Sequence, residues 1–477
     1  MGPGGKPAMP GMLLAMPMDA WVAWSRTQSA AAITAALADP GHPSFAAMAA
    51  IADACDSADA AERDRGLRAL FAGVVEALND GLDAPGRAAS ACWFAHAAWR
   101  CAARDPDLRA ALAEDGIADE AALVARHARL RAGSDPWPAQ PRRIAVLSRV
   151  TVGADILLTS VLLQRLHGRW PAAELVLIGD GKLAGLLALP GVRVVPVAYQ
   201  RRGTLGERLR AWLAVRKAVR DQGADLVVSP DSRLDQLGLF PTHPDPARHR
   251  LWENLQPAPA RPEGLSALLD AWCDRELGGS PAVPRVALAP AYAALAERLR
   301  AALGPGRWCA VKLDTGGNPA KALPRAAEIQ WLRALRAAGW GVVLDRGFGP
   351  AELAASDALC ADAGLVPVDL DEGGTLGRDP RALMAGDLAA AGTVRFHGSI
   401  AGWAAAVAGC TRALSYDSVG QHLAAALGVP VVVPFAGFSG PAFITAWSPR
   451  GAPATVIAVA DPADGAVWTQ VSAALTA

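Results

Sequence analysis

The chain has 477 residues, 52% of them hydrophobic and 19% charged, and its 46 basic residues balance its 46 acidic residues. A neutral balance argues against a nucleic-acid-binding protein, which needs a basic surface, and the apolar content argues against global disorder. The length suggests about three structural units. Every long apolar run is interrupted by Gly, Pro or a charge, so we expect neither a transmembrane segment nor a signal peptide.

The seven cysteines are odd in number and form no CxxC pair. Reduced, buried thiols in a cytoplasmic protein are the simplest explanation. We expect residues 1–18 to be a disordered tail and residues 19–135 to be a helical domain. Its helices are expected at Trp21–Leu37, Pro43–Ala54, Ala60–Asn79 and Pro85–Arg104, with shorter helices as far as Arg131. His96 lies among aromatic residues of the fourth helix, which is typical of a core histidine.

After a Pro-rich linker at 133–141 the pattern alternates between strands and helices, which predicts a parallel sheet. Strands are expected at Arg143–Leu147, Glu174–Ile178, Val192–Val197 and Asp225–Ser229. Helices are expected from Gly153 to about His167, at Lys182–Leu189 and at Leu205–Asp221, the last one basic and amphipathic. This first α/β domain is expected to span 142–290. The stretch 231–254 has no assignment.

A helix at Ala291–Leu303 leads into a second α/β domain, expected at 305–477. Its strands are expected at Trp308–Leu313, Gly341–Leu344, Val394–His397, Arg412–Tyr416, Val431–Pro434 and Thr455–Ala458. Its helices are expected at Glu328–Ala338, Ala351–Ala361, Ile400–Ala408, Val419–Leu427 and the C-terminus. The predicted fold class is α/β, with two Rossmann-like domains that face each other across a cleft and follow an all-α N-terminal domain.

The helix expected at Val419–Leu427 is the strongest candidate for a ligand site. Asp417 and Ser418 suit its N-cap, and Gly428 suits the position after its end. It follows a strand, so its N-terminus opens at the edge of the sheet where ligands bind. Free N–H groups and the positive end of the helix dipole favour a phosphate there. His422, one turn into the helix, could point at the same anion. The competing interpretation is an ordinary capped helix.

Two other stretches carry charged residues at the same kind of edge. Gly153-Ala154-Asp155 follows the first strand, where a carboxylate could accept a proton from a hydroxyl group; alternatively, Asp155 merely caps a helix. The second stretch is a Gly-rich loop, Thr315-Gly316-Gly317-Asn318-Pro319-Ala320-Lys321. Its backbone could approach a ligand while Lys321 supplies a charge. Its spacing is not that of a P-loop, and a plain loop with a surface lysine is the alternative.

Two further motifs give weaker signals. His397-Gly398-Ser399 forms a turn before a capped helix and could contact a base or ribose through its backbone. Asp369-Leu370-Asp371 matches the acidic pair of metal-dependent sugar transferases, but its Gly- and acid-rich surroundings favour a solvated loop. The His and Cys spacings indicate no metal site.

Together these residues resemble glycosyltransferase family 9, the heptosyltransferase family, over about 142–460. The resemblance rests on Gly153-Ala154-Asp155 with Thr159, on Lys321, on His397-Gly398-Ser399, and above all on Asp417-Ser418-x-x-x-His422 with the Leu-Ala-Ala-Ala-Leu-Gly-Val-Pro that follows. It implies the GT-B arrangement and inverting, metal-independent transfer of a heptose-like sugar from a nucleotide diphosphate sugar, typically ADP-linked. It implies no cofactor beyond that donor.

Under this resemblance Asp155 is the general base on the acceptor hydroxyl. Donor binding falls to Thr315, Gly316, Lys321, His397, Gly398, Ser399, Asp417, Ser418, Gly420, Gln421 and His422. Ala154 and Val419 stand where the family usually has Gly, which leaves the donor open. The acceptor is a small molecule, a glycan or a protein, and the helical domain is a candidate for recruiting it or for oligomerisation. Alternatives are a sugar-nucleotide epimerase or hydrolase of the same architecture, or a non-catalytic sugar-nucleotide-binding scaffold.

Overall fold

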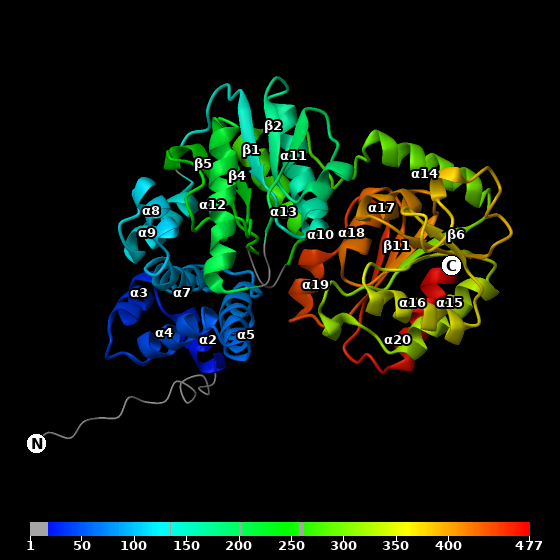
Figure 1. The fold of residues 1–477 in the computed structure, drawn as a ribbon, viewed down its shortest axis with the longest axis horizontal. Helices are drawn as coiled ribbons and strands as arrows, with labels where there is room; N and C mark the ends of the chain where they lie inside the picture. Colours follow the sequence, from blue (N-terminus) through cyan, green and yellow to red (C-terminus); the bar gives the residue numbers. More distant parts are fainter. Residues whose placement is uncertain (1–17, 134, 200–202, 257–261) are drawn as a thin grey trace, which may run out of the picture. The chain divides into compact units, whose positions relative to one another are not determined.

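The computed structural model describes residues 18–133, 135–199, 203–256 and 262–477 (Figure 1). The expected N-terminal tail lies outside these residues except for Met18, where the first helix begins. Two compact units result. The first contains the helical region with β1, α12, β4 and β5, and the second contains residues 149–175, 181–194 and the chain from Pro262 onward. The domain boundaries expected from the sequence stay predictions.

The N-terminal region is helical, as predicted. Its elements are α2 (Met18–Thr27), α3 (Ala30–Ala38), α4 (Pro43–Cys55), α5 (Ala60–Arg68), the π-helical η1 (Ala69–Glu76), α6 (Ala77–Asn79), α7 (Ala84–Ala102), α8 (Pro106–Glu114) and α9 (Glu120–Ala132). The single helix expected at Trp21–Leu37 is wrong. The first helix ends at Thr27. The hydroxyl of Ser29 then accepts from the N–H of Ala32 and caps a second helix, α3.

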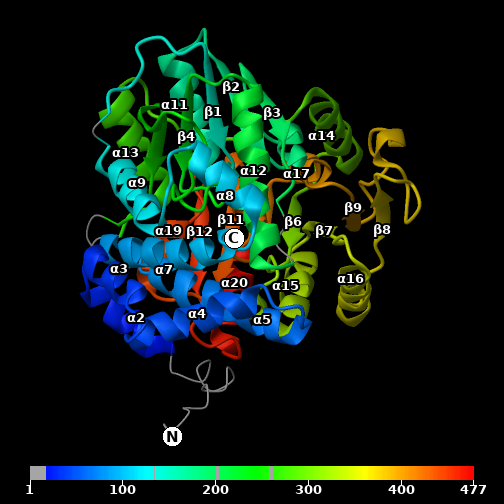
Figure 2. The same cartoon turned by 60° about the vertical axis from the view of Figure 1, so that its left-hand side comes forward.

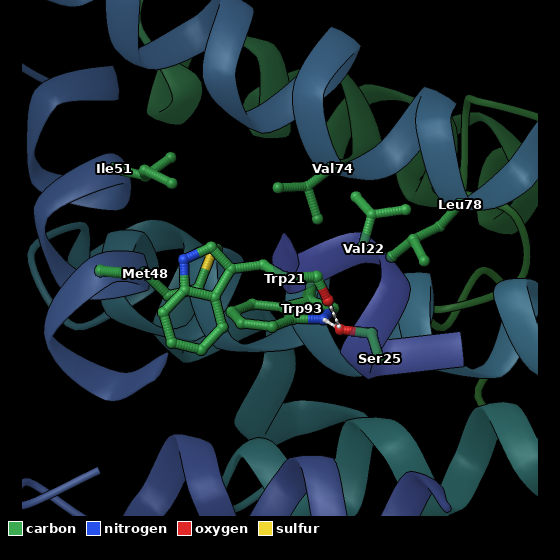
Figure 3. A pocket seen from close by; sticks show the side chains of 9 residues that line it. Trp21, Val22, Ser25, Met48, Ile51, Val74, Leu78 and Trp93 are labelled. Carbon is green, nitrogen blue, oxygen red and sulfur yellow. Dashed lines mark hydrogen bonds between the residues drawn. The ribbon is translucent and has the colours of Figure 1, made fainter. Parts of the chain in front are cut away.

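The core of this region forms around α7. Trp93 is buried and its indole N–H donates to Ser25 at 2.7 Å, beside a small apolar pocket (Figure 3). The pocket is lined by Trp21, Val22, Ser25, Ala47, Met48, Ile51, Val74, Leu78 and Trp93. His96 is buried, and its Nδ1 lies 2.9 Å from Glu120. The prediction of a core histidine is therefore confirmed.

The first sheet has the strand order β3-β2-β1-β4-β5, and β1, β4 and β5 run parallel. Its strands are β1 (Arg143–Leu147), β2 (Glu174–Gly179), β3 (Val192–Pro196), β4 (Leu226–Pro230) and β5 (His249–Trp252). The connections include α10 (Val152–Ala154), η2 (Asp155–Thr159), α11 (Ser160–Arg169), η3 (Gly181–Gly185), α12 (Leu205–Asp221) and η4 (Pro246–Arg248).

One expectation for this sheet needs correction, and one unassigned stretch is resolved. The helix expected at Lys182–Leu189 is only the short 3₁₀ turn η3, which ends at Gly185, because a glycine in the middle of a helix weakens it. The unassigned stretch 231–254 contains β5, whose four residues include His249 and Arg250 and therefore do not look like a buried strand.

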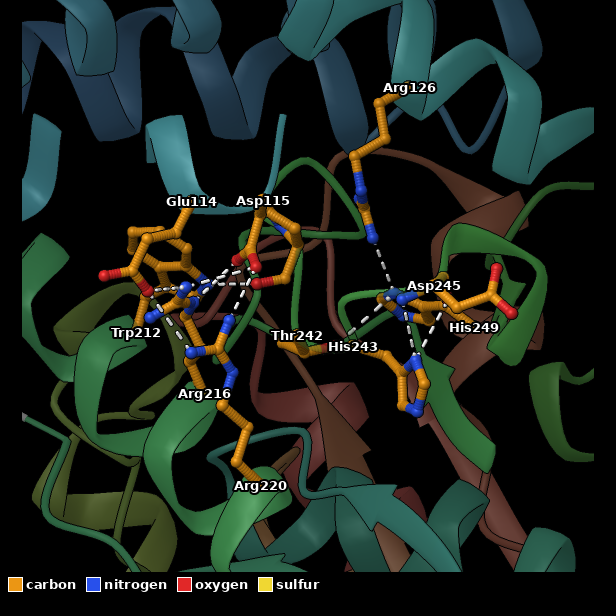
Figure 4. A network of polar contacts seen from close by, with 11 residues as sticks. Glu114, Asp115, Arg126, Trp212, Arg216, Arg220, Thr242, His243, Asp245 and His249 are labelled. Atoms are coloured by element: carbon orange, nitrogen blue, oxygen red, sulfur yellow. Dashed lines mark hydrogen bonds and ion pairs between the residues drawn. The ribbon is translucent and has the colours of Figure 1, made fainter. Parts of the chain in front are cut away.

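The helical region shares a core with α12. Leu205, Leu209 and Trp212 of α12 are buried in one cluster with the side chains of α7. Ion pairs add to this apolar packing. Arg216 and Arg220 of α12 pair with Glu114 and Asp115 at the end of α8 (Figure 4). The basic face predicted for α12 is thus covered by acidic residues of the same unit.

The second sheet has seven strands in the order β12-β11-β10-β6-β7-β9-β8, all paired in parallel. Figure 2 shows β6, β7, β9 and β8 following one another across it. The strands are β6 (Trp308–Lys312), β7 (Gly341–Asp345), β8 (Val368–Asp371), β9 (Thr393–His397), β10 (Arg412–Ser415), β11 (Val431–Phe435) and β12 (Ala454–Ala458). The predicted α/β class with two Rossmann-like sheets is confirmed.

The helices of the second unit are α13 (Leu265–Leu277), α14 (Pro290–Leu303), α15 (Arg325–Ala337), α16 (Pro350–Ala363), α17 (Ile400–Ala408), α18 (Val419–Ala426), α19 (Pro441–Trp447) and α20 (Gly465–Thr476), with the short turns η5 (Pro319–Lys321) and η6 (Pro380–Ala382). The sequence interpretation missed α13, α19 and β8.

All seven cysteines are buried free thiols, as predicted. Within the described ranges, no helix has the length and apolar character needed to cross a bilayer.

Candidate functional site

The order of the second sheet defines where a ligand is expected. The chain leaves β6 for β7 on one side and returns later to β10 on the other side. In open α/β sheets, ligands bind outside the carboxyl ends of the strands at such a switch point. The segments that follow β6 and β10 are the Gly-rich loop with Lys321 and the start of α18, so topology brings the two strongest donor-site motifs to one place.

The start of α18 is built as predicted. Ser418 is the N-cap, and its hydroxyl accepts from the N–H of Gly420. A side chain at position 420 would put its Cβ 2.4 Å from Oγ of Ser415 and 3.2 Å from Cδ of Lys312. Only glycine fits this close approach between the helix and the ends of β10 and β6. Gly428, with a φ of +80°, follows the helix end.

Lys321 reaches α18 and is not a plain surface lysine. Its Nζ lies 2.5 Å from Oδ2 of Asp417 and 3.1 Å from the carbonyl oxygen of the same residue. The other carboxylate oxygen of Asp417 accepts from the side-chain amide of Gln421 at 2.7 Å. Burial raises the pKa of Asp417, while Lys321 and Gln421 oppose that rise. The lysine charge therefore faces a carboxylate directly.

His422 and Gln421 carry the polar atoms that a ligand could satisfy. Burial, reinforced by the charge of Lys321, lowers the pKa of His422 to about 3, so the ring is neutral at neutral pH. Within the described residues, Nδ1 of His422 and Oε1 of Gln421 are buried without a hydrogen-bond partner. Such atoms are rare in native proteins and call for a missing partner. If His422 contacts the expected anion, its ring does so in the neutral form.

Asp155 is held by the loop that precedes its own helix. It is 1% exposed, and its Oδ1 accepts from the backbone N–H of Arg149 at 2.7 Å and from the hydroxyl of Thr159 at 2.8 Å. Thr151, and not Asp155, occupies the N-cap position. Asp155 is therefore not the N-cap of its helix, and its carboxylate instead binds the preceding loop at Arg149. Val150, which follows Arg149 in this loop, has a φ of +77°. This conformation is strained for a β-branched residue, and such strain is typical of functional loops.

The turn that carries Asp155 packs on the start of α18. A Cβ at Gly153 would lie 3.1 Å from Cδ2 of His422 and 3.2 Å from Cα of Val419. The following η2 also packs against α18. Asp155 and the helix N-terminus thus belong to one unit, and Gly153 is a point of close contact.

The other predicted donor residues lie elsewhere on the same sheet edge. Thr315 and Gly316 are in the loop after β6, where the N–H of Gly316 donates to Asp314 at 2.8 Å. His397 ends β9, and its Nδ1 lies 2.7 Å from the carbonyl oxygen of Gly347. Its ring centroid is 6.4 Å from that of Phe348, an exposed aromatic side chain.

The start of α17 is already occupied by a side chain of the protein. Oε2 of Glu372 accepts from the N–H of Ser399 at 2.5 Å, and a Cβ at Gly398 would lie 2.3 Å from the same oxygen. The hydroxyl of Ser399 contacts that of Tyr292 at 3.2 Å. The backbone N–H of Ser399, which was expected to contact a nucleotide, therefore donates to Glu372 instead. Glu372 was not among the residues predicted for the site.

The acidic pair Asp369–Asp371 lies in β8, so the expectation of a solvated loop is wrong. Asp369 pairs with Arg395, at 2.7 Å from Oδ1 to Nε. Asp371 accepts from the N–H groups of Gly373, Thr375 and Leu376. Burial by itself would raise the pKa of Asp371, but these hydrogen bonds lower it to about 2. Both carboxylates are thus engaged by the protein itself.

Sequence reasoning missed Lys312, a lysine at the end of the apolar strand β6. It is 4% exposed and pairs with Asp345, with Asp314 at 3.6 Å. A lysine that closes an otherwise apolar run, Trp-Cys-Ala-Val-Lys, was the available signal.

The buried neutral His422 predicts a pH dependence of stability. Its folded pKa of about 3 lies below the usual value of 6.5, so between these pH values the unfolded state binds the extra proton. Stability should fall by about 1.4 kcal/mol per pH unit for this group as the pH drops through that window. His422→Gln should remove that part of the slope. Urea unfolding at pH 7 and pH 4.5 measures it, with His243→Gln as control; an unchanged slope in His422→Gln would contradict the buried neutral ring.

No protein-family model and no curated protein matches the sequence. Among solved structures, the glycosyl transferase family 9 protein of Veillonella parvula is 15% identical, with a TM-score of 0.52, covering 72% of this chain and 99% of its own. The E. coli ADP-heptose lps heptosyltransferase II is 16% identical over 70% of this chain and 98% of its own, with a TM-score of 0.47. An E. coli heptosyltransferase with ADP is 16% identical over 70% and 100%, with a TM-score of 0.48. The first match shows that the chain has the fold expected from the resemblance; at this identity it shows the fold alone.

Proposed function

We propose that this protein is a glycosyltransferase that moves a sugar from a nucleotide diphosphate sugar to an acceptor hydroxyl. The observation that carries the proposal is the packing of the Asp155 turn on the first turn of α18, where Lys321, Asp417 and Gln421 also meet. A carboxylate and an anion-attracting helix start within one unit are the two parts that such a transfer needs. The unpartnered buried atoms of Gln421 and His422 support a ligand at this place.

The proposed reaction inverts the configuration at the anomeric carbon. The carboxylate of Asp155 accepts the proton of the acceptor hydroxyl while the acceptor oxygen forms a bond to the anomeric carbon. The bond from that carbon to the diphosphate oxygen breaks on the opposite face, and the nucleotide diphosphate leaves with the electron pair. The N–H groups at the start of α18 and the ammonium of Lys321 would stabilise the charge that develops on it.

We propose that no metal ion is required. The acidic pair that could hold one is engaged by Arg395 and by three backbone N–H groups. Helix and lysine charges would take the place of a cation at the leaving group. A heptose-like, ADP-linked donor follows from the resemblance, as do an acceptor domain at 142–290 and a donor domain at 305–477. Cytoplasmic location, and an oligomer formed through the helical region, stay predictions.

Isothermal titration with ADP, GDP, CDP, UDP and dTDP, and with the corresponding sugar nucleotides, tests the proposal. At least one should bind in the micromolar range or tighter, and binding of none would contradict it. Product analysis without acceptor then separates the alternatives. A hydrolase or epimerase consumes or converts the donor under these conditions, whereas a transferase leaves most of it intact until an acceptor is added.

Lys321→Met should weaken binding of the nucleotide diphosphate by about tenfold or more, because a charge-assisted contact is lost. It also leaves the buried Asp417 without its cation, which adds repulsion toward an anion. Lys217→Met is the matched control, since that lysine is 73% exposed on α12. Equal affinities in Lys321→Met and the wild type would show that Lys321 does not bind the donor.

A further inference from the structure

The loop that carries Lys321 is exposed over most of its length. Residues 316–320 are exposed, and within the described chain a Cβ at Gly316 or Gly317 would meet no neighbouring atom within 4 Å. The first buried residue after this stretch is Leu323, which is 5% exposed. The position of Lys321 therefore depends on the contacts that hold the end of the loop.

The hydroxyl of Tyr416 holds this end. The backbone N–H of Leu323 donates to the hydroxyl at 3.2 Å, and the hydroxyl in turn donates to Oε1 of Glu328 in α15 at 2.9 Å. Tyr416 is 0% exposed, and its ring packs edge-on against that of Trp331, with the centroids 6.3 Å apart. Because a buried N–H group needs a partner, this hydroxyl fixes the backbone two residues beyond Lys321.

Two further contacts lie on either side of this one. A Cβ at Gly437, in the loop after β11, would lie 2.7 Å from the carbonyl oxygen of Ala320, so that loop lies directly against the turn η5. The ammonium of Lys321 contacts both the carboxylate and the carbonyl oxygen of Asp417. Tyr416 and Asp417 are consecutive residues after β10, so one short stretch of backbone holds both the loop and the tip of its lysine.

We infer that Tyr416 is a positioning residue of the donor site, whose hydroxyl fixes the loop so that the ammonium of Lys321 stays at the start of α18. The inference rests on the proposed function and deepens it, because it assigns the group that keeps this lysine in place. Lysine is a point charge on a flexible stem, so its contribution to phosphate binding depends on where its backbone is held. Without the hydroxyl, the N–H of Leu323 is left buried and unpaired, and the loop relieves that cost by moving.

The test is a double-variant cycle with Tyr416→Phe and Lys321→Met. The probe is the nucleoside diphosphate that the wild type binds most tightly among ADP, GDP, CDP, UDP and dTDP. Tyr416→Phe should lower the affinity by about fivefold when Lys321 is present. In the Lys321→Met background the same change should alter the affinity by less than about twofold, because no ammonium is left to be displaced.

Tyr199→Phe is the matched control, since it removes a tyrosine hydroxyl from the first unit. It should bind the probe as the wild type does. Glu328→Gln is the conservative variant, because its amide oxygen still accepts from the hydroxyl of Tyr416. Its affinity should stay within about twofold of the wild type.

Unchanged affinity in Tyr416→Phe would overturn the inference. So would an equal loss in both backgrounds, which indicates a structural role that does not act through Lys321. A loss in Glu328→Gln as large as that in Tyr416→Phe would also overturn it, because the charge of Glu328 would then matter more than the hydroxyl. A wild type that binds none of the five diphosphates would instead refute the proposed function itself.

Discussion

Asp155→Asn should lower the rate of sugar transfer by about 10²–10⁴-fold, the usual contribution of a positioned general base. The amide cannot accept the proton of the acceptor hydroxyl, but it keeps the size of the carboxylate. Its carbonyl oxygen can still accept from the N–H of Arg149 and the hydroxyl of Thr159, so the loop should keep its conformation. Affinity for the nucleotide sugar should stay within about threefold, because the base acts on the acceptor.

Initial rates at saturating donor, together with titration of the donor, separate these effects. Asp221→Asn is the matched control, because this aspartate is 53% exposed at the end of α12. A variant that transfers sugar at the normal rate would show that Asp155 is not the base. A variant that loses donor affinity as strongly as rate would point to damage in the packing of its turn on α18.

Arg87→Met should destabilise the first unit by about 3–5 kcal/mol, the range for breaking a buried ion pair by removal of one partner. Arg87 of α7 is 3% exposed, and its Nη1 lies 2.6 Å from the carboxylate of Asp231, which follows β4. Its Nε is 3.7 Å from Glu253, whose pKa is raised by burial although Arg87 and Arg131 oppose that rise. Methionine fills a similar volume but leaves these carboxylates without that cation.

Urea unfolding followed by circular dichroism measures the loss. Arg100→Met on the same helix is the control, because its partner Asp53 is 48% exposed and surface pairs contribute at most about 1 kcal/mol. The double variant Arg87→Met/Asp231→Asn should recover part of the loss, since the charge at position 231 is then gone and asparagine tolerates the φ of +55° there. A loss below about 1 kcal/mol in Arg87→Met would mean that this pair does not fasten α7 to the loop after β4.

The sequence determined the α/β class, the helical N-terminal region and the start of α18, because each depends on short-range patterns. Buried parallel strands are continuous apolar runs, and Asp417-Ser418 before an apolar helix with Gly428 after it is a local capping signal. The same locality explains the misses. β5 and β8 carry polar or charged residues whose partners lie outside the strand, such as Arg126 for His249 and Arg395 for Asp369, so nothing in the strand itself indicates burial.

Only the tertiary structure decided how charges are matched at the candidate site. Lys321 and Asp417 are 96 residues apart, and only the folded chain brings the lysine against this carboxylate. The neutral state of His422 follows from its burial, and the loss of the Ser399 N–H follows from Glu372, 27 residues earlier. The sequence shows which residues are ionisable. Their pKa values and the electrostatic potential at the site depend on distances and burial, which are set only when the chain has folded.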